Sequence, residues 1–148
     1  MSGDSIFRLL LFASLAWLMP ACNAPASTGA PTAAPSPLVQ FSRTGGFAGV
    51  NDHLTIGPNR QATLTQKSGQ SQFEIDQQTY DQLRQQLEQV GFAKLKPDYP
   101  APPGAADVFT YTVTYQGQTV RAQDTAVPAS LQPVVSTLNG IVQAHGKR

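Results

Sequence analysis

Two different periods of apolar residues constrain the fold of this chain more than any other feature of its sequence. Over residues 38–75, and again over 108–123, short segments alternate apolar with polar side chains, and glycine-containing turns separate them. Alternation with a period of two is typical of strands that bury one face. Two other segments repeat apolar residues every three or four positions, which is typical of amphipathic helices: Tyr80, Leu83, Leu87 and Val90, then Leu131, Val134, Val135, Leu138, Ile141 and Val142.

The order of these segments predicts an α+β fold. We expect strands over residues 38–43, 49–56, 61–66, 73–75, 108–115 and 119–123. Asp76 is a suitable N-cap for the first helix and Gly91 a suitable stop, and the second helix should begin near Ser130, so that Pro133 lies in its first turn. The proline-containing segment 96–106 is expected to be an irregular loop. These features favour an antiparallel sheet of about six strands, with both helices packed on one face.

The residues before position 38 are not expected to belong to this fold. Arg8, the apolar run 9–19 and Ala21 are typical of a secretory signal peptide. Cys22, the only cysteine, follows at once and resembles the cysteine of a bacterial lipobox, which receives a diacylglyceryl group and acyl chains such as palmitate. The alternative is a plain signal peptide with an accidental cysteine. Residues 23–37 carry no charge and no large apolar side chain, so a disordered linker rich in proline and alanine is expected there.

Three parts of the chain follow from this interpretation. Residues 1–21 form the expected lipoprotein signal peptide, residues 22–37 the lipidated Cys22 and its linker, and residues 38–148 one α+β domain. The protein is therefore expected to be exported and anchored by lipid at the cell membrane or the outer membrane. With no second cysteine, the domain must be stabilised by its hydrophobic core instead of a disulfide.

Several classes of function are disfavoured. The net charge of +1 leaves no basic excess to neutralise phosphates, so nucleic acid is not an expected partner. The spacing of His, Cys, Asp and Glu residues matches no metal-binding or cofactor-binding motif. Asp52 and His53 are neighbours in a strand and point to opposite faces, so they do not form a catalytic pair by themselves. A binding protein is therefore expected, with neither metal nor cofactor, and an enzyme would require His53 to find a carboxylate elsewhere.

Three blocks of sequence resemble the emfourin family of small proteins, which inhibit protealysin, a thermolysin-like zinc metallopeptidase. The most specific block is Ser-Arg-Thr-Gly-Gly-Phe-Ala-Gly-Val over residues 42–50. Residues 107–115 are similar to the family's Asp-x-Phe-x-Tyr strand, and residues 127–131 with the following helix are similar to its end. The resemblance covers about residues 38–142 and implies an inhibitor that fills the active-site cleft of a metallopeptidase.

The resemblance also implies a set of contact residues. Arg43, Gly45, Gly46 and Phe47 come from the most specific block, and Asp52, Asp98 and Asp107 are further candidates for contacts near a zinc ion of the peptidase. Phe47 admits two interpretations. It could project from a glycine-built tip and enter the peptidase's pocket for large apolar residues, or it could plug the edge of the sheet while the glycines merely form a turn.

A second function from a different class stays open. The domain could be an envelope-anchored scaffolding lipoprotein that binds an unknown partner through the open edge or face of the sheet, around Thr110, Thr112 and Thr114. An exposed Phe47 favours inhibition over this alternative, and a buried Phe47 favours scaffolding.

Overall fold

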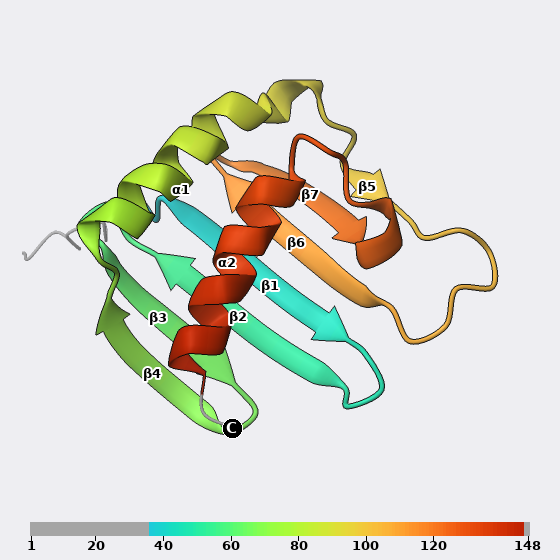
Figure 1. Ribbon diagram of the computed structural model, residues 1–148, viewed down its shortest axis with the longest axis horizontal. Helices are drawn as coiled ribbons and strands as arrows, with labels where there is room; N and C mark the ends of the chain where they lie inside the picture. The colour runs from blue at the N-terminus through green and yellow to red at the C-terminus, as the bar shows by residue number, and fades with distance from the viewer. Residues whose placement is uncertain (1–35, 147–148) are drawn as a thin grey trace, which may run out of the picture. The chain divides into compact units, whose positions relative to one another are not determined.

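Seven strands form one sheet in the computed structural model, which describes residues 36–146 (Figure 1). Their spatial order is β4-β3-β2-β1-β6-β7-β5. Along the chain the elements are β1 (Val39–Gly45), β2 (Val50–Ile56), β3 (Gln61–Gln66), β4 (Gly69–Glu74), α1 (Gln77–Val90), η1 (Phe92–Lys94), β5 (Asp98–Tyr99), β6 (Phe109–Tyr115), β7 (Gln118–Gln123), η2 (Asp124–Ala126) and α2 (Gln132–His145). The signal peptide, Cys22 and all but the last two residues of the linker lie outside the described residues.

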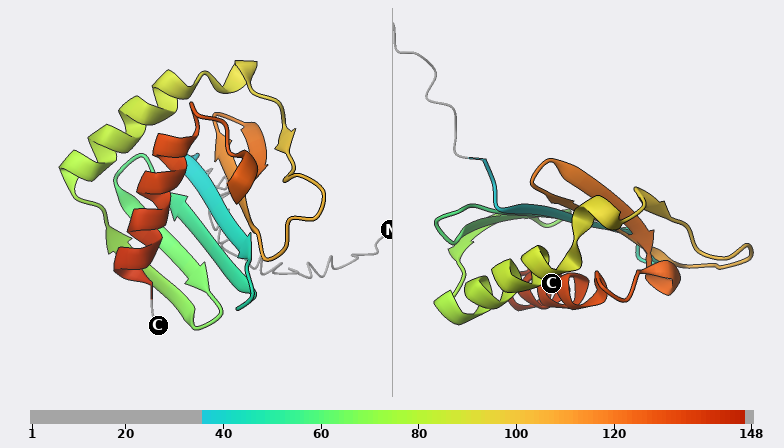
Figure 2. Two further views of the ribbon diagram at one scale, coloured as in Figure 1. Left: turned by 45° about the vertical axis from the view of Figure 1, so that its right-hand side comes forward. Right: turned by 90° about the horizontal axis from the view of Figure 1, so that it is seen from above.

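Both helices cover the same face of the sheet, as predicted (Figure 2). The apolar residues of the alternating strands point to this face, and together with the apolar stripes of α1 and α2 they form one buried core. The other face of the sheet carries no helix within residues 36–146 (Figure 2). None of the helices in this range has the length and apolar character needed to cross a membrane.

The ends of α1 are as predicted. The Asp76 carboxylate accepts a hydrogen bond from the backbone N–H of Thr79 at 2.9 Å, and this bond lowers the pKa of Asp76. Gly91 ends the helix in the left-handed conformation with a φ of 65°. The second helix begins at Gln132, two residues later than predicted, and Pro133 still lies in its first turn.

The prediction of an antiparallel sheet of about six strands is wrong in one respect. A seventh strand, β5, lies inside the segment expected to be an irregular loop, and it pairs parallel with β7, so the sheet is mixed. Only two residues take part, Asp98 beside Arg121 and Tyr99 beside Ala122, and prolines stand on both sides of them. The backbone N–H of Arg121 donates to the carbonyl of Pro97 at 2.8 Å. A strand this short has no alternation of side chains from which it could be predicted.

The register of β1 separates the two ends of the sheet. Gly45 pairs with Val50 on β2 and with Phe109 on β6, whereas Val39 pairs with Ile56 and Tyr115. The β1–β2 loop (residues 46–49) therefore lies at the same end as the β3–β4 turn (residues 67–68), the start of β6 and η2. We call this the loop end. The β6–β7 turn (residues 116–117) lies at the opposite end, where the chain enters β1.

Candidate functional site

The β1–β2 loop presents one apolar side chain to solvent. Phe47 is 98% exposed and is the one exposed large hydrophobic side chain among residues 36–146. The loop closes through a hydrogen bond from the N–H of Gly49 to the carbonyl of Gly46 at 2.8 Å. Its first residue is fixed to the segment that enters β6, because the N–H of Gly46 donates to the carbonyl of Val108 at 3.3 Å. Of the two interpretations of Phe47, the structure supports the projecting tip.

The two glycines before Phe47 are required by packing as well as by conformation. Gly45 and Gly46 have φ values of 104° and 68°, which side-chain-bearing residues rarely adopt. A Cβ on Gly46 would lie 2.7 Å from the ring of Phe109, and one on Gly45 would lie 2.5 Å from the carbonyl oxygen of Val108. Both distances are far below van der Waals contact. The base of the loop therefore sits directly against the start of β6.

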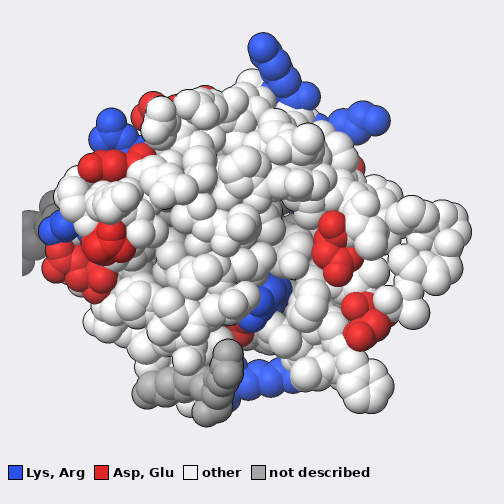
Figure 3. All heavy atoms as spheres, viewed as in Figure 1, with Lys and Arg blue, Asp and Glu red and all other residues white. Residues whose placement is uncertain are grey.

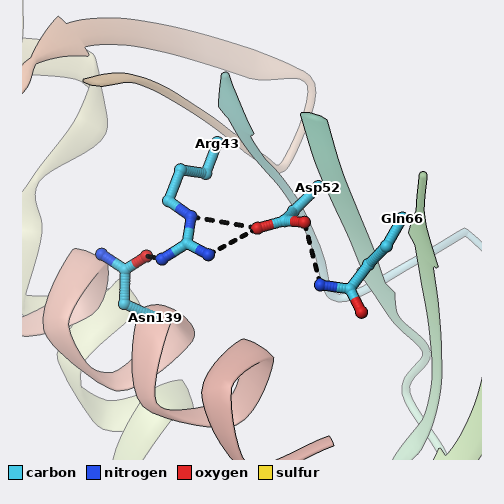
Figure 4. Close-up of polar contacts among 4 residues, drawn as sticks. All are labelled: Arg43, Asp52, Gln66 and Asn139. Carbon is cyan, nitrogen blue, oxygen red and sulfur yellow. Dashed lines mark hydrogen bonds and ion pairs between the residues drawn. The ribbon is translucent and has the colours of Figure 1, made fainter. Parts of the chain in front are cut away.

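A charged network lies behind the loop, on the face covered by the helices (Figure 4). Nε and Nη2 of Arg43 donate to Oδ2 of Asp52 at 3.0 and 2.6 Å, and Nη1 of Arg43 donates to Oδ1 of Asn139 at 3.3 Å. The second oxygen of Asp52 accepts from Nε2 of Gln66 at 2.9 Å. We call these four residues the Arg43 network. It joins β1, β2, β3 and α2 immediately below the residues that carry the tip.

The Arg43 network contains a buried charge, the carboxylate of Asp52. Asp52 is only 4% exposed and is the one buried charged or polar residue of the described chain, while the Arg43 side chain is 17% exposed. A buried carboxylate is tolerated only when its charge is balanced and its oxygens accept hydrogen bonds, and Arg43 and Gln66 meet both needs. The guanidinium of Arg43 also lies 5.6 Å from the centre of the Phe109 ring. The network thus holds the same ring against which Gly46 packs.

The structure brings most of the predicted contact residues together. Arg43, Gly45, Gly46, Phe47 and Asp52 all belong to the β1–β2 hairpin at the loop end.

The two remaining candidates lie apart from the hairpin. Asp107 is exposed and directly precedes Val108, whose carbonyl holds Gly46, so it borders the same end. Asp98 lies on β5, the outermost strand of the sheet, beside Arg121 and four strands away from β2.

Sequence reasoning did not include three residues that position the loop, namely Gln66, Phe109 and Asn139. The chain did carry a signal for part of this arrangement. Arg43 follows Val39 and Phe41 in phase, and Asp52 precedes Leu54 and Ile56 in phase, so both charges fall on the buried face of their strands. Opposite charges on the buried faces of consecutive strands indicate an ion pair. Gln66 and Asn139 could not be found in this way, because their proximity depends on how β3 and α2 pack.

His53 lies on the other face of the sheet from Asp52, as the alternation predicts. It is exposed, and its Nε2 lies 2.9 Å from the side-chain oxygen of Asn51. It also borders a small hollow of about 160 Å³ with Ser42 and Thr112. Within residues 36–146, no three His, Cys, Asp or Glu side chains are placed to hold a metal ion.

Comparison with known protein families decides the relationship of this chain. A sequence model of the family described as Emfourin matches residues 41–139, about two thirds of the chain. The chain belongs to the emfourin family. The emfourin match includes the β1–β2 loop and all four residues of the Arg43 network, from Arg43 near its start to Asn139 at its end. No curated protein sequence matches the chain significantly.

Proposed function

We propose that this emfourin domain inhibits a thermolysin-like metallopeptidase by inserting the β1–β2 loop into its active-site cleft, with Phe47 in the pocket for large apolar residues. The observation that carries the proposal is the 98% exposure of Phe47 on a loop held from behind. Moving a fully exposed phenylalanine into an apolar pocket contributes about 2 kcal/mol. A loop already held in one conformation loses little entropy on binding, so more of this gain appears as affinity.

Within this proposal the candidate residues have different roles. Phe47 is the residue that enters the pocket, and Asp107 lies where it can contact the rim of the cleft. Gly45 and Gly46 allow the close approach of the loop to β6. Arg43 and Asp52 hold the hairpin from inside, since Asp52 is buried and both of its oxygens are bonded within the domain. Asp98 is too far across the sheet to act with Phe47.

A lipid anchor is the second part of the proposal. We infer that the chain is exported and that Cys22 carries the lipid, so the peptidase it meets is in the cell envelope or outside the cell. The support is the sequence before residue 38, where the apolar run 9–19 is followed by the small residue Ala21 and then by Cys22, the only cysteine. Replacing Cys22 with Ala should abolish labelling by a radioactive fatty acid and move the protein from the membrane fraction to the soluble fraction. Continued labelling would show that the lipid is attached elsewhere.

The inhibitory part is tested by titrating a fixed amount of protealysin with the protein and measuring the cleavage of a quenched fluorescent peptide. We expect stoichiometric loss of activity with the wild-type protein and a loss of inhibition of at least about tenfold with Phe47→Ala. Gln116→Ala, in the turn at the opposite end, is the matched control and should inhibit as the wild type does. Equal inhibition by all three proteins would exclude Phe47 as the inserted residue.

The open face of the sheet supports an alternative, a scaffolding protein that binds a neutral polar partner there. On this face the strands β3, β2, β1 and β6 expose no Asp, Glu, Lys or Arg. The exposed side chains are threonines, amides, Ser42 and His53. Threonine also suits exposed strands for its conformation alone, so this composition is weaker support than an exposed aromatic tip. Thr112→Arg would disturb a partner on this face without affecting protease inhibition.

A further inference from the structure

A pocket lies beside the β1–β2 loop, at the end of the sheet that carries Phe47. Its volume is about 270 Å³, and its lining includes Ala48 from the loop, Arg43 and Asp52 from the network, and Gln66, Lys67 and Ser68 from the end of β3 and the β3–β4 turn. We call it the loop-side pocket. The exposed Phe47 and the loop-side pocket are therefore neighbouring features, one projecting and one recessed, on a single edge of the domain.

The charge of the loop-side pocket is positive. Arg43 and Asp52 neutralise each other, because two nitrogens of Arg43 donate to Oδ2 of Asp52, and this leaves the ammonium of Lys67. Lys67 takes part in no ion pair within residues 36–146. Its Nζ reaches back to the loop, since a Cβ built on Gly49 would lie only 3.2 Å from it. Figure 3 shows basic groups near the centre and at the lower edge of the face that carries the helices.

We propose that the loop-side pocket receives a carboxylate side chain from the rim of the peptidase cleft while Phe47 occupies the apolar pocket. This inference rests on the proposed inhibitory function and assigns a second contact to it. A carboxylate complements the ammonium of Lys67, which pairs with no carboxylate of residues 36–146 and can donate to both oxygens of the incoming group. The apolar contact of Phe47 supplies affinity, and the charged contact sets the orientation in which the loop enters the cleft.

A rim contact of this kind affects the rate of association more than the final affinity. Exposed opposite charges guide two proteins together over distances of about a Debye length, and salt weakens this guidance. Lys67→Glu should therefore slow the association of the inhibitor with protealysin by about tenfold at low salt. Lys67→Gln should slow it less, and the differences from the wild type should largely disappear at an ionic strength of about 0.5 M.

The experiment measures association rates by stopped-flow inhibition of protealysin, with the full chain purified as its host processes it. Lys94→Glu is the matched control. It makes the same change in net charge on η1, whose neighbour Ala93 shares a hollow with Gln116 of the opposite turn. Melting curves of the three variants should equal that of the wild type, because both lysines are exposed.

The outcomes separate the two proposals. Slower association for Lys67→Glu than for the control Lys94→Glu, reversed by salt, supports the carboxylate contact. Equal rates for Lys67→Glu and Lys94→Glu overturn the contact, and if Phe47→Ala still loses inhibition, the inhibitory function stands without it. Absence of inhibition by the wild-type protein overturns both proposals at the first step.

Discussion

The β1–β2 loop and the β6–β7 turn, at opposite ends of the sheet, use glycine in different ways. In the β6–β7 turn, Gln116 and Gly117 have φ values of 49° and 78°, and nothing lies within 4 Å of a Cβ built on Gly117. In the β1–β2 loop, Gly46 has a similar φ, but its Cβ would collide with the Phe109 ring. The first turn needs glycine only for its backbone conformation. The second also needs it for packing, and this additional constraint occurs where an aromatic side chain is presented to solvent.

The largest expected effect comes from the Arg43 network, which lies behind the β1–β2 loop and has no counterpart at the β6–β7 turn within residues 36–146. Asp52→Ala would leave the Arg43 guanidinium partly buried without its counter-charge, and we expect the free energy of unfolding to fall by about 3 kcal/mol. Chemical denaturation followed by circular dichroism measures this change. The double variant Arg43→Met/Asp52→Leu removes both charges together and should recover most of the loss. A loss below about 1 kcal/mol for Asp52→Ala would show that the network contributes little to the hairpin.

The next effect tests the difference between the two glycines directly. Gly46→Ala should lower the free energy of unfolding by about 2–3 kcal/mol, because the new Cβ must displace the Phe109 ring in addition to adopting a positive φ. Gly117→Ala should lower it by about 1 kcal/mol, because only the backbone conformation is unfavourable. The same denaturation measurement serves both variants. If the two losses were equal, Phe109 would be free to move aside and the packing argument for the loop would fail.

Much of the fold could be predicted from the sequence, because its elements depend on local patterns. The helix α1 lies between an N-cap at Asp76 and a stop at Gly91, and both signals are contained within the segment itself. The alternation in β1, β2, β3 and β6 likewise identifies the buried face of each strand. Strand β5 could not be predicted, since it exists only because β7 offers its free edge to two residues between prolines.

In the candidate site, too, local features could be predicted from the sequence and features that depend on distant residues could not. The glycines and Phe47 are adjacent in sequence, so the loop itself could be recognised. Whether Phe47 is exposed could not be decided, because a phenylalanine after a glycine turn can fold back onto the edge of a sheet as readily as it can project. In the structure the space beside Gly46 is occupied by Phe109, which lies more than sixty residues further along the chain. Long-range packing of this kind is absent from a local pattern.

The smallest effect on stability is expected at Phe47 itself. Phe47→Ala removes a side chain that is 98% exposed, so the free energy of unfolding should change by less than about 0.5 kcal/mol. Phe109→Ala is the variant to compare with it, because the Phe109 ring is partly buried between Gly46 and Arg43. Loss of this ring should lower the free energy of unfolding by about 2 kcal/mol.

Hydrogen exchange separates the roles of the two phenylalanines. The exchange of residues 46–49 should accelerate in Phe109→Ala and stay unchanged in Phe47→Ala. If both variants weakened inhibition while only Phe109→Ala affected stability and exchange, one phenylalanine would act by contact with the peptidase and the other by holding the loop in place. A stability loss for Phe47→Ala comparable to that of Phe109→Ala would instead place Phe47 in the packed edge of the sheet and remove the difference between the two turns.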